Sequence, residues 1–186
     1  MGDGFTTEAY VDLLDAAEAG GYEFRTVAEY LSADSLPERF LILRHDVDRK
    51  ADNAARTARI EADRGVPATY YVRTSTFDSS FVRTLESLGH EVGYHYEDLV
   101  RADGDVTAAH GRFARNLAEF RRHCDVRTVC MHGNPLSPHD NREMWTAAET
   151  DFSLSPTVWS LIFSGPSSHV RPVSEKYVTS VKSIER

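Results

Sequence analysis

The residues best suited to chemistry begin with the run HDVD at residues 45–48, which is separated from the apolar stretch FLIL at 40–43 by Arg44 alone. Residues two apart on an extended chain point to the same side, which brings the carboxylates of Asp46 and Asp48 to about 7 Å from each other. Carboxylates this close resist joint ionisation unless a cation neutralises them. One aspartate can then ligate a metal ion while the other acts as general base. Local pairing of these charges with the basic residues at 49–50 is the alternative that the run leaves open.

Two histidines stand at comparable places farther along the chain. His95 lies near the end of the apolar run 90–96, and His132 ends the run 126–132. The carboxyl ends of parallel strands meet at one edge of an α/β sheet, and ligands bind at that edge. An aspartate and two histidines with open positions suit Zn²⁺ or another first-row divalent ion. His95 alone also fits a packed core histidine, and His132 alone fits the start of a Gly-Asn-Pro turn; their coincidence favours a metal site.

The elements that must position these residues alternate along the chain. Apolar runs indicate strands, and 3.6-residue periodicity or a closing glycine indicates helices. Four such alternations with short connections predict right-handed βαβ units and a parallel sheet or barrel. Two further helices are expected before the first strand. We expect strands from residue 39 and at 67–73, 90–96 and 126–132, and helices at 7–19, 26–33, 50–65, 78–88, 105–123 and around 139–149.

The pattern weakens after residue 150. The last segment is rich in serine and has no clear period, and only the run VWSLIF at 158–163 resembles a further strand. We expect one domain, with a barrel-like catalytic unit and its N-terminal helices over 1–150. Residues 151–186 are expected to be an atypical segment of the same domain or an irregular tail.

Charge and hydropathy exclude several classes of protein. The 186 residues carry a net charge of −8, which disfavours the phosphate backbone of nucleic acids as a partner. No apolar run approaches the ~20 residues of a membrane span, and the N-terminus has no signal-peptide pattern. A cytoplasmic protein that acts on a small molecule or a carbohydrate is the expectation, and the oligomeric state stays open.

The motifs together resemble the polysaccharide deacetylase superfamily, the relatives of carbohydrate esterase family four. RHDVD after an apolar strand, GHEVGYH about 45 residues on and MHGNPLSPHDN carry the resemblance, which covers roughly 39–145. It implies an intracellular branch with a distorted (β/α) barrel and a metal-dependent N-deacetylase site, most simply a zinc site. The barrel is expected to be incomplete at its C-terminal end, because His169 does not fit the late histidine of that superfamily and the general acid stays unassigned.

The resemblance also implies a role for each motif residue. Asp46 would be the catalytic base and Asp48 a metal ligand, and His95 matches the first histidine of an HxxxH pair. The second position is Leu99, so another ligand must replace the missing histidine. His132 is the favoured replacement, and Glu97 is the alternative.

The expected function is therefore hydrolysis of an N-acetyl group on a sugar or a related amide. His45, Tyr96, Glu97 and Asn134 are expected to contact the substrate, and Asn141 could also bind hydroxyl groups. A catalytically weak or inactive relative that binds a metal or ligand is a second hypothesis. A third is an amidohydrolase that opens a cyclic ureide, since one scaffold can host several chemistries.

Overall fold

Every strand pairing in the described part of the chain is parallel. The computed structural model describes residues 6–145 and 178–180. The strands follow the order β1-β2-β3-β4-β5, and β6 pairs with β2. The strands are β1 (Glu23–Arg25), β2 (Phe40–Val47), β3 (Thr69–Val72), β4 (Glu91–Tyr96), β5 (Val129–Met131) and β6 (Val178–Ser180).

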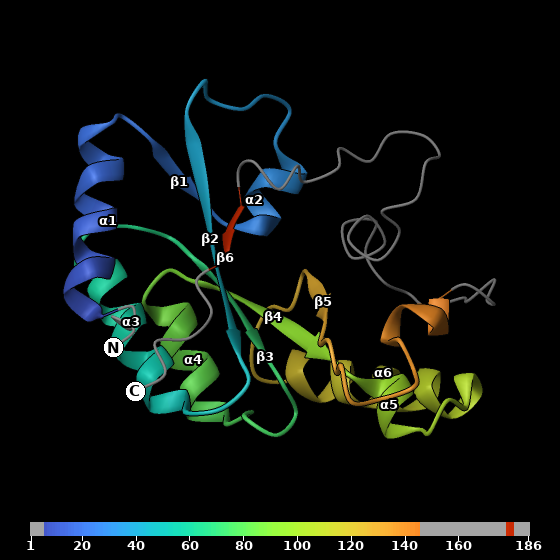
Figure 1. Cartoon of the computed structure of the whole chain (residues 1–186). Coiled ribbons are helices and arrows are strands. Elements are labelled where there is room, and N and C mark those ends of the chain that lie inside the picture. Colours follow the sequence, from blue (N-terminus) through green and yellow to red (C-terminus); the bar gives the residue numbers. More distant parts are fainter. Residues whose placement is uncertain (1–5, 146–177, 181–186) are drawn as a thin grey trace.

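Helices connect the consecutive strands from β2 to β5, as the predicted βαβ alternation requires. The α-helices are α1 (Thr7–Ala19), α2 (Val27–Ser32), α3 (Ala51–Ala62), α4 (Ser79–Ser87), α5 (Asp98–Arg101) and α6 (Val106–Arg121), and η1 (Asn141–Trp145) is a 3₁₀-helix. The sheet curls as part of a barrel, with β2, β3 and β4 at its centre (Figure 1). The strands β1 and β5 at its two ends do not pair with each other among the described residues. The α/β architecture and a partial barrel are therefore confirmed.

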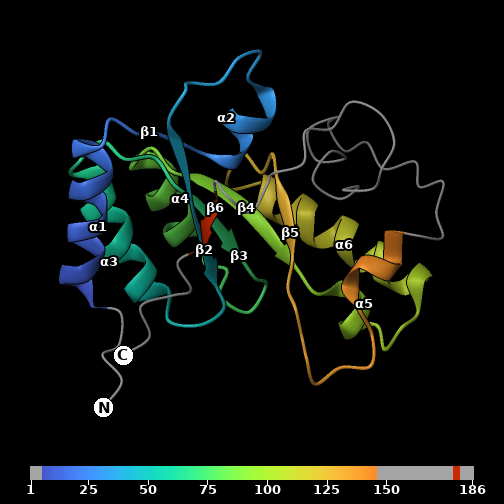
Figure 2. The same ribbon diagram turned by 45° about the horizontal axis from the view of Figure 1, so that its top comes forward.

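The two faces of the sheet are covered differently. Helices α1, α3, α4 and α6 supply residues to the main core on one face, where Leu43 and Tyr70 are fully buried. Helix α2 packs on the other face with Ile42 and Tyr71 (Figure 2). Side chains alternate along a strand, so neighbouring residues of β2 enter different layers. This alternation decides which residues reach the candidate site.

Local sequence signals explain where the helices begin and end. Thr26 and Glu29 form a capping box at the start of α2, where the expected helix 26–33 begins. Gly65 and Gly89 adopt φ of +68° and +88° shortly after α3 and α4, a conformation that strains any residue with a Cβ atom. The short elements β1 and α5 were not predicted, and the helix expected around 139–149 is, within the described residues, the 3₁₀-helix η1.

The C-terminal segment is described only in part. Residues 178–180 join the sheet through the pairing of β6 with β2. The two alternatives for residues 151–186, a segment of the same domain or an irregular tail, stay predictions. The strand expected at 158–163 and the residue His169 lie outside the described residues. Across the described residues, every helix is too short or too polar to cross a membrane.

Candidate metal site

Three predicted ligands meet at the carboxyl edge of the sheet. The Asp48 Oδ1 atom lies 3.1 Å from His132 Nδ1 and 3.6 Å from His95 Nε2, and the two nitrogens are 3.2 Å apart. A triangle with these edges has a circumscribed radius of about 1.9 Å, so a point 2.0–2.2 Å from all three atoms exists, as zinc bonds to nitrogen and oxygen require. These three side chains are the group of potential ligands found among the described residues.

The surroundings of His95 Nε2 and Asp48 Oδ1 are those expected of atoms that bind a cation. His95 Nδ1 lies 3.1 Å from the Cys130 carbonyl oxygen and must carry its proton to donate there, which leaves a lone pair on Nε2 facing Asp48. Burial is the main cause that lowers the pKa of His95, so the ring is neutral at pH 7. Asp48 Oδ1 is buried and has no hydrogen-bond partner among the described residues. A buried carboxylate oxygen without a hydrogen bond lowers the stability of the folded protein unless a cation binds it.

Backbone pairing and one asparagine hold His132 in place. The His132 N–H donates to the Tyr96 carbonyl at 2.8 Å, which extends the β4–β5 pairing by one residue. The buried Asn141 side chain donates to the His132 carbonyl at 2.9 Å and accepts from the Val100 N–H at 3.1 Å. Asn141 therefore links the η1 and α5 segments to the His132 backbone, rather than offering its amide to a substrate.

Asp46 faces the cluster but is held by an arginine. Arg44 donates to both carboxylate oxygens of Asp46, from Nε at 2.9 Å and from Nη2 at 2.8 Å. The Arg44 guanidinium also lies over the Tyr71 ring, 5.1 Å from its centre. Asp46 Oδ2 is 3.9 Å from His95 Nε2, which places the expected base beside the three potential ligands. The bidentate pair fixes the direction of its oxygens.

Glu97 does not join the cluster. Its carboxylate accepts from Arg73 at 2.7 Å and from Arg101 at 3.0 Å. Burial raises the pKa of Glu97, but these two arginines outweigh it, and the pKa is lowered. The structure thus brings His132 rather than Glu97 to Asp48 and His95. Leu99 occupies the position where the resemblance places a second histidine. Its side chain is buried in the main core and not at the cluster.

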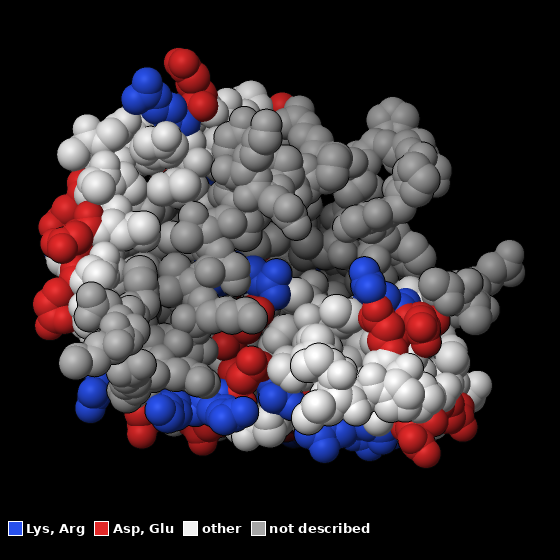
Figure 3. Space-filling model, viewed as in Figure 1, with Lys and Arg blue, Asp and Glu red and all other residues white. Residues whose placement is uncertain are grey.

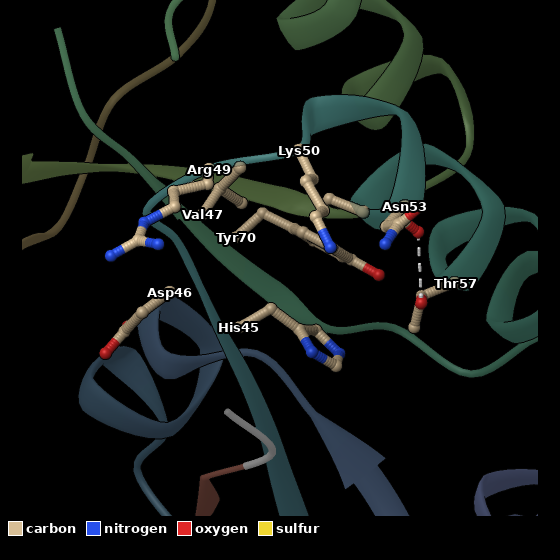
Figure 4. Close-up of a pocket in the computed structure, with 9 residues that line it drawn as sticks. His45, Asp46, Val47, Arg49, Lys50, Asn53, Thr57 and Tyr70 are labelled. Carbon is tan, nitrogen blue, oxygen red and sulfur yellow. Dashed lines mark hydrogen bonds between the residues drawn. The ribbon is translucent and has the colours of Figure 1, made fainter. Parts of the chain in front are cut away.

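Strand alternation separates the remaining predicted residues from the site. Figure 4 shows His45 and Asp46 on opposite sides of β2. Tyr96 lies in the main core, where its hydroxyl accepts from the Trp145 indole N–H at 2.9 Å. His45 bonds to the buried Glu61 and lines a small cavity with Asp46, whereas Tyr96 belongs to the main core. The expectation that His45 and Tyr96 contact substrate stays a prediction. Asn134 lies in an open cavity lined by the loop 131–141, next to His132.

A buried polar network lies on the face of the sheet that carries the main core. Glu61, which is fully buried, accepts hydrogen bonds from Tyr10, from Tyr70 at 2.5 Å and from His45 Nε2 at 2.6 Å. Burial raises the pKa of Glu61, but the bonds from His45 and the two tyrosines lower it more, and the net shift is downward. The network ties α1 and α3 to β2 and β3, which fixes the strand that carries Asp46.

His90 closes the same network from β4's amino end. Its Nδ1 accepts from the Ala68 N–H at 3.2 Å, and its Nε2 lies 2.9 Å from the Ala58 carbonyl oxygen. Only a neutral ring protonated on Nε2 can make both bonds. Burial is the largest cause lowering the pKa of His90, in agreement with that state. His90 therefore has a structural role, because it ties the backbone of α3 to the start of β3.

Sequence reasoning missed Arg44, Arg73 and the backbone role of Asn141. Arg44 could have been found from the alternation that pairs it with Asp46 on one side of β2. Arg73 directly follows β3, and its Nη1 lies 3.7 Å from Asp48 Oδ1. That contact depends on the order of the strands in the sheet. In the space-filling view, acidic and basic side chains lie next to each other near the centre of the face (Figure 3).

No protein-family model, curated protein or solved structure matches this chain. The likeness to the deacetylase motifs thus stays a prediction from the residues. What the cluster can do chemically follows from its own geometry.

Proposed function

We propose that the protein is a metal-dependent hydrolase that removes an N-acetyl group from a sugar or a related amide. Asp48, His95 and His132 would hold the divalent cation, and Zn²⁺ best suits one oxygen and two nitrogen donors. The observation that carries the proposal is the buried Asp48 Oδ1, which lacks a hydrogen bond yet lies 3.1 and 3.6 Å from two histidine nitrogens.

The chemistry at this site divides between the cation and the protein. A bound divalent cation supplies Lewis acidity, which polarises an amide carbonyl and acidifies water. Asp46 is the residue placed to accept a proton from an attacking water, because its Oδ2 lies 3.9 Å from His95 Nε2. Arg44 orients both Asp46 oxygens and keeps the carboxylate from turning toward other partners.

The ion pair between Arg44 and Asp46 also supports a second candidate function. Both Asp46 oxygens already accept from Arg44, so both are engaged by a protein donor rather than by a water molecule. A protein that binds a metal or ligand without turnover would keep such a pair. Opening of a cyclic ureide is a further amide chemistry that the same constellation could support.

Metal content and hydrolysis together test the proposal. We expect purified protein loaded with Zn²⁺ to hold one ion per chain and to release acetate from acetylated chitooligosaccharides. Asp46→Asn should keep the ion and lose hydrolysis by about 10²-fold or more, while Asp125→Asn, at the opposite rim before β5, should change neither. Absence of stoichiometric binding with Zn²⁺, Co²⁺ or Mn²⁺ overturns the metal site. Tight binding without hydrolysis of any amide supports the non-catalytic candidate.

A further inference from the structure

The charges at the cluster do not follow the charge of the whole chain. The protein carries a net charge of −8, and acidic side chains line the outer side of α1 (Figure 3). The charged side chains in or beside the cluster comprise four arginines and three carboxylates. They are Arg44, Arg49, Arg73, Arg101, Asp46, Asp48 and Glu97. This leaves one positive charge at the cluster, and a divalent cation would raise it to three.

Arg49 lies at the same edge and stays unpaired within the described part of the chain. It directly follows Asp48 and is exposed, and Figure 4 shows its guanidinium on the same side of β2 as Asp46. Among the described residues, no hydrogen bond or ion pair engages it. Lys50, the next residue, points to the other side with His45. A guanidinium beside the site offers five N–H donors suited to a carboxylate or phosphate.

Arg73 contributes a second unsatisfied donor. Its Nη2 donates to Glu97 at 2.7 Å, and its Nη1 is 3.7 Å from Asp48 Oδ1. The buried Nε of Arg73 has no hydrogen-bond partner among the described residues. Glu97 is shared with Arg101, so one carboxylate faces two guanidinium groups. The pair of arginines therefore keeps an excess of positive charge next to the cluster.

We propose that the amide substrate carries an acidic group, a carboxylate or a phosphate, and that Arg49 binds this group while Arg73 adds to the attraction. This inference rests on the proposed function and names the class of substrate for the same site. An anion beside the cluster replaces the water around Arg49 with a charge-assisted hydrogen bond. A neutral acetylated sugar gains nothing from the same residues.

Matched pairs of ligands test the inference without requiring turnover. The dissociation constants of N-acetylglucosamine and its 6-phosphate, and of N-acetylglycinamide and N-acetylglycine, are measured by calorimetry on the Zn²⁺-loaded full chain. We expect the acidic member of at least one pair to bind on the order of tenfold more tightly. The preference should shrink as salt rises from 50 to 500 mM, because Arg49 is exposed. The two pairs distinguish a phosphate from a carboxylate as the recognised group.

Variants separate Arg49 from the cation, which itself attracts anions. Arg49→Gln should reduce the preference to about threefold or less, and Arg49→Lys should retain part of it, since the charge remains. Arg127→Gln removes one charge before β5, at the opposite rim, and should leave the preference unchanged. Equal affinity within both pairs, or an equal loss in Arg49→Gln and Arg127→Gln, overturns the inference. Hydrolysis of neutral amides with one bound ion would leave the proposed function standing in that case, whereas failure to bind metal would remove both.

Discussion

Replacing Asp48 by asparagine should change stability and metal binding in opposite directions. The side chain is 36% exposed, but its Oδ1 atom is buried without a hydrogen bond. An amide of the same shape carries no charge, and its nitrogen can donate to a lone pair on His95 or His132. The metal-free protein should therefore be at least as stable in Asp48→Asn as in the native sequence, although a predicted ligand has been removed.

The magnitudes follow from the local contacts. Leaving a buried polar atom unsatisfied costs about 1–3 kcal/mol, and the partial exposure of Asp48 favours the lower end. A gain of about 1 kcal/mol corresponds to about 2–4 °C in melting temperature for a chain of this length. A cation that binds only the folded state adds about 2.7 kcal/mol at one hundred times its Kd, or about 5–10 °C. Asp48→Asn should lose that second increment.

Thermal unfolding with and without Zn²⁺ measures both effects in one experiment. The native protein is expected to melt higher with the ion than with a chelator, and Asp48→Asn is expected to melt at the same temperature in both. Asp103→Asn, a fully exposed position, serves as the matched control and should behave as the native protein. A chelated Asp48→Asn protein that melts several degrees below the native one would refute the view that Asp48 Oδ1 is strained without a cation. A Zn²⁺ response that survives in this variant would refute its role as ligand.

Three further predictions concern residues that support the site. Asn141→Ala frees the His132 backbone and should weaken Zn²⁺ binding about tenfold in calorimetry; an effect no larger than that of Asn134→Ala, at a half-buried position in the same loop, would contradict this. The pKa of His90 is lower in the folded protein than in the unfolded chain. Below about pH 6.5 the unfolded chain therefore binds a proton at His90 that the folded protein does not bind, and the free energy of unfolding should fall as the pH drops. His90→Gln should show a smaller fall in urea unfolding, and an unchanged pH profile would exclude His90 as its source. Glu61→Ala breaks a buried charged network and should cost about 3–5 kcal/mol in urea unfolding; a loss below about 1 kcal/mol would show that the network contributes little.

The longer elements were predictable because their patterns repeat. The expected helix 7–19 coincides with α1, and the expected helix 105–123 corresponds to α6, which buries Phe113, Leu117 and Phe120 at helical spacing. The elements β1 and α5 have three and four residues, which is too short for any period to show. Strand limits differed because pairing with neighbours, and not composition, decides where a strand ends; β5 begins at Val129 although the apolar run starts at 126.

The candidate site was predictable where one strand supplies the information and not where several must combine. The ends of the strands at Asp48, His95 and His132 follow from local patterns plus the rule that parallel strands end together. The contact of Arg73 with Asp48 and that of Asn141 with the His132 carbonyl join residues 25 and 9 positions apart. No local pattern encodes such contacts, because they depend on strand order and on the path of the loop after β5.

The HDVD run shows how one short segment serves both stability and the site. The alternation along β2 places Asp46 on the side of the three potential ligands and His45 on the side of the main core. There His45 bonds to Glu61, and its ring centre lies 4.6 Å from that of Tyr70. The rigid attachment of His45 reduces the freedom of the peptide that carries Asp46, which a site accurate to a few tenths of an ångström requires. A change at His45 should therefore alter stability first and metal affinity second, while a change at Asp48 reverses that order. The two faces of one strand can thus be separated by measurement, although they share a single sequence motif.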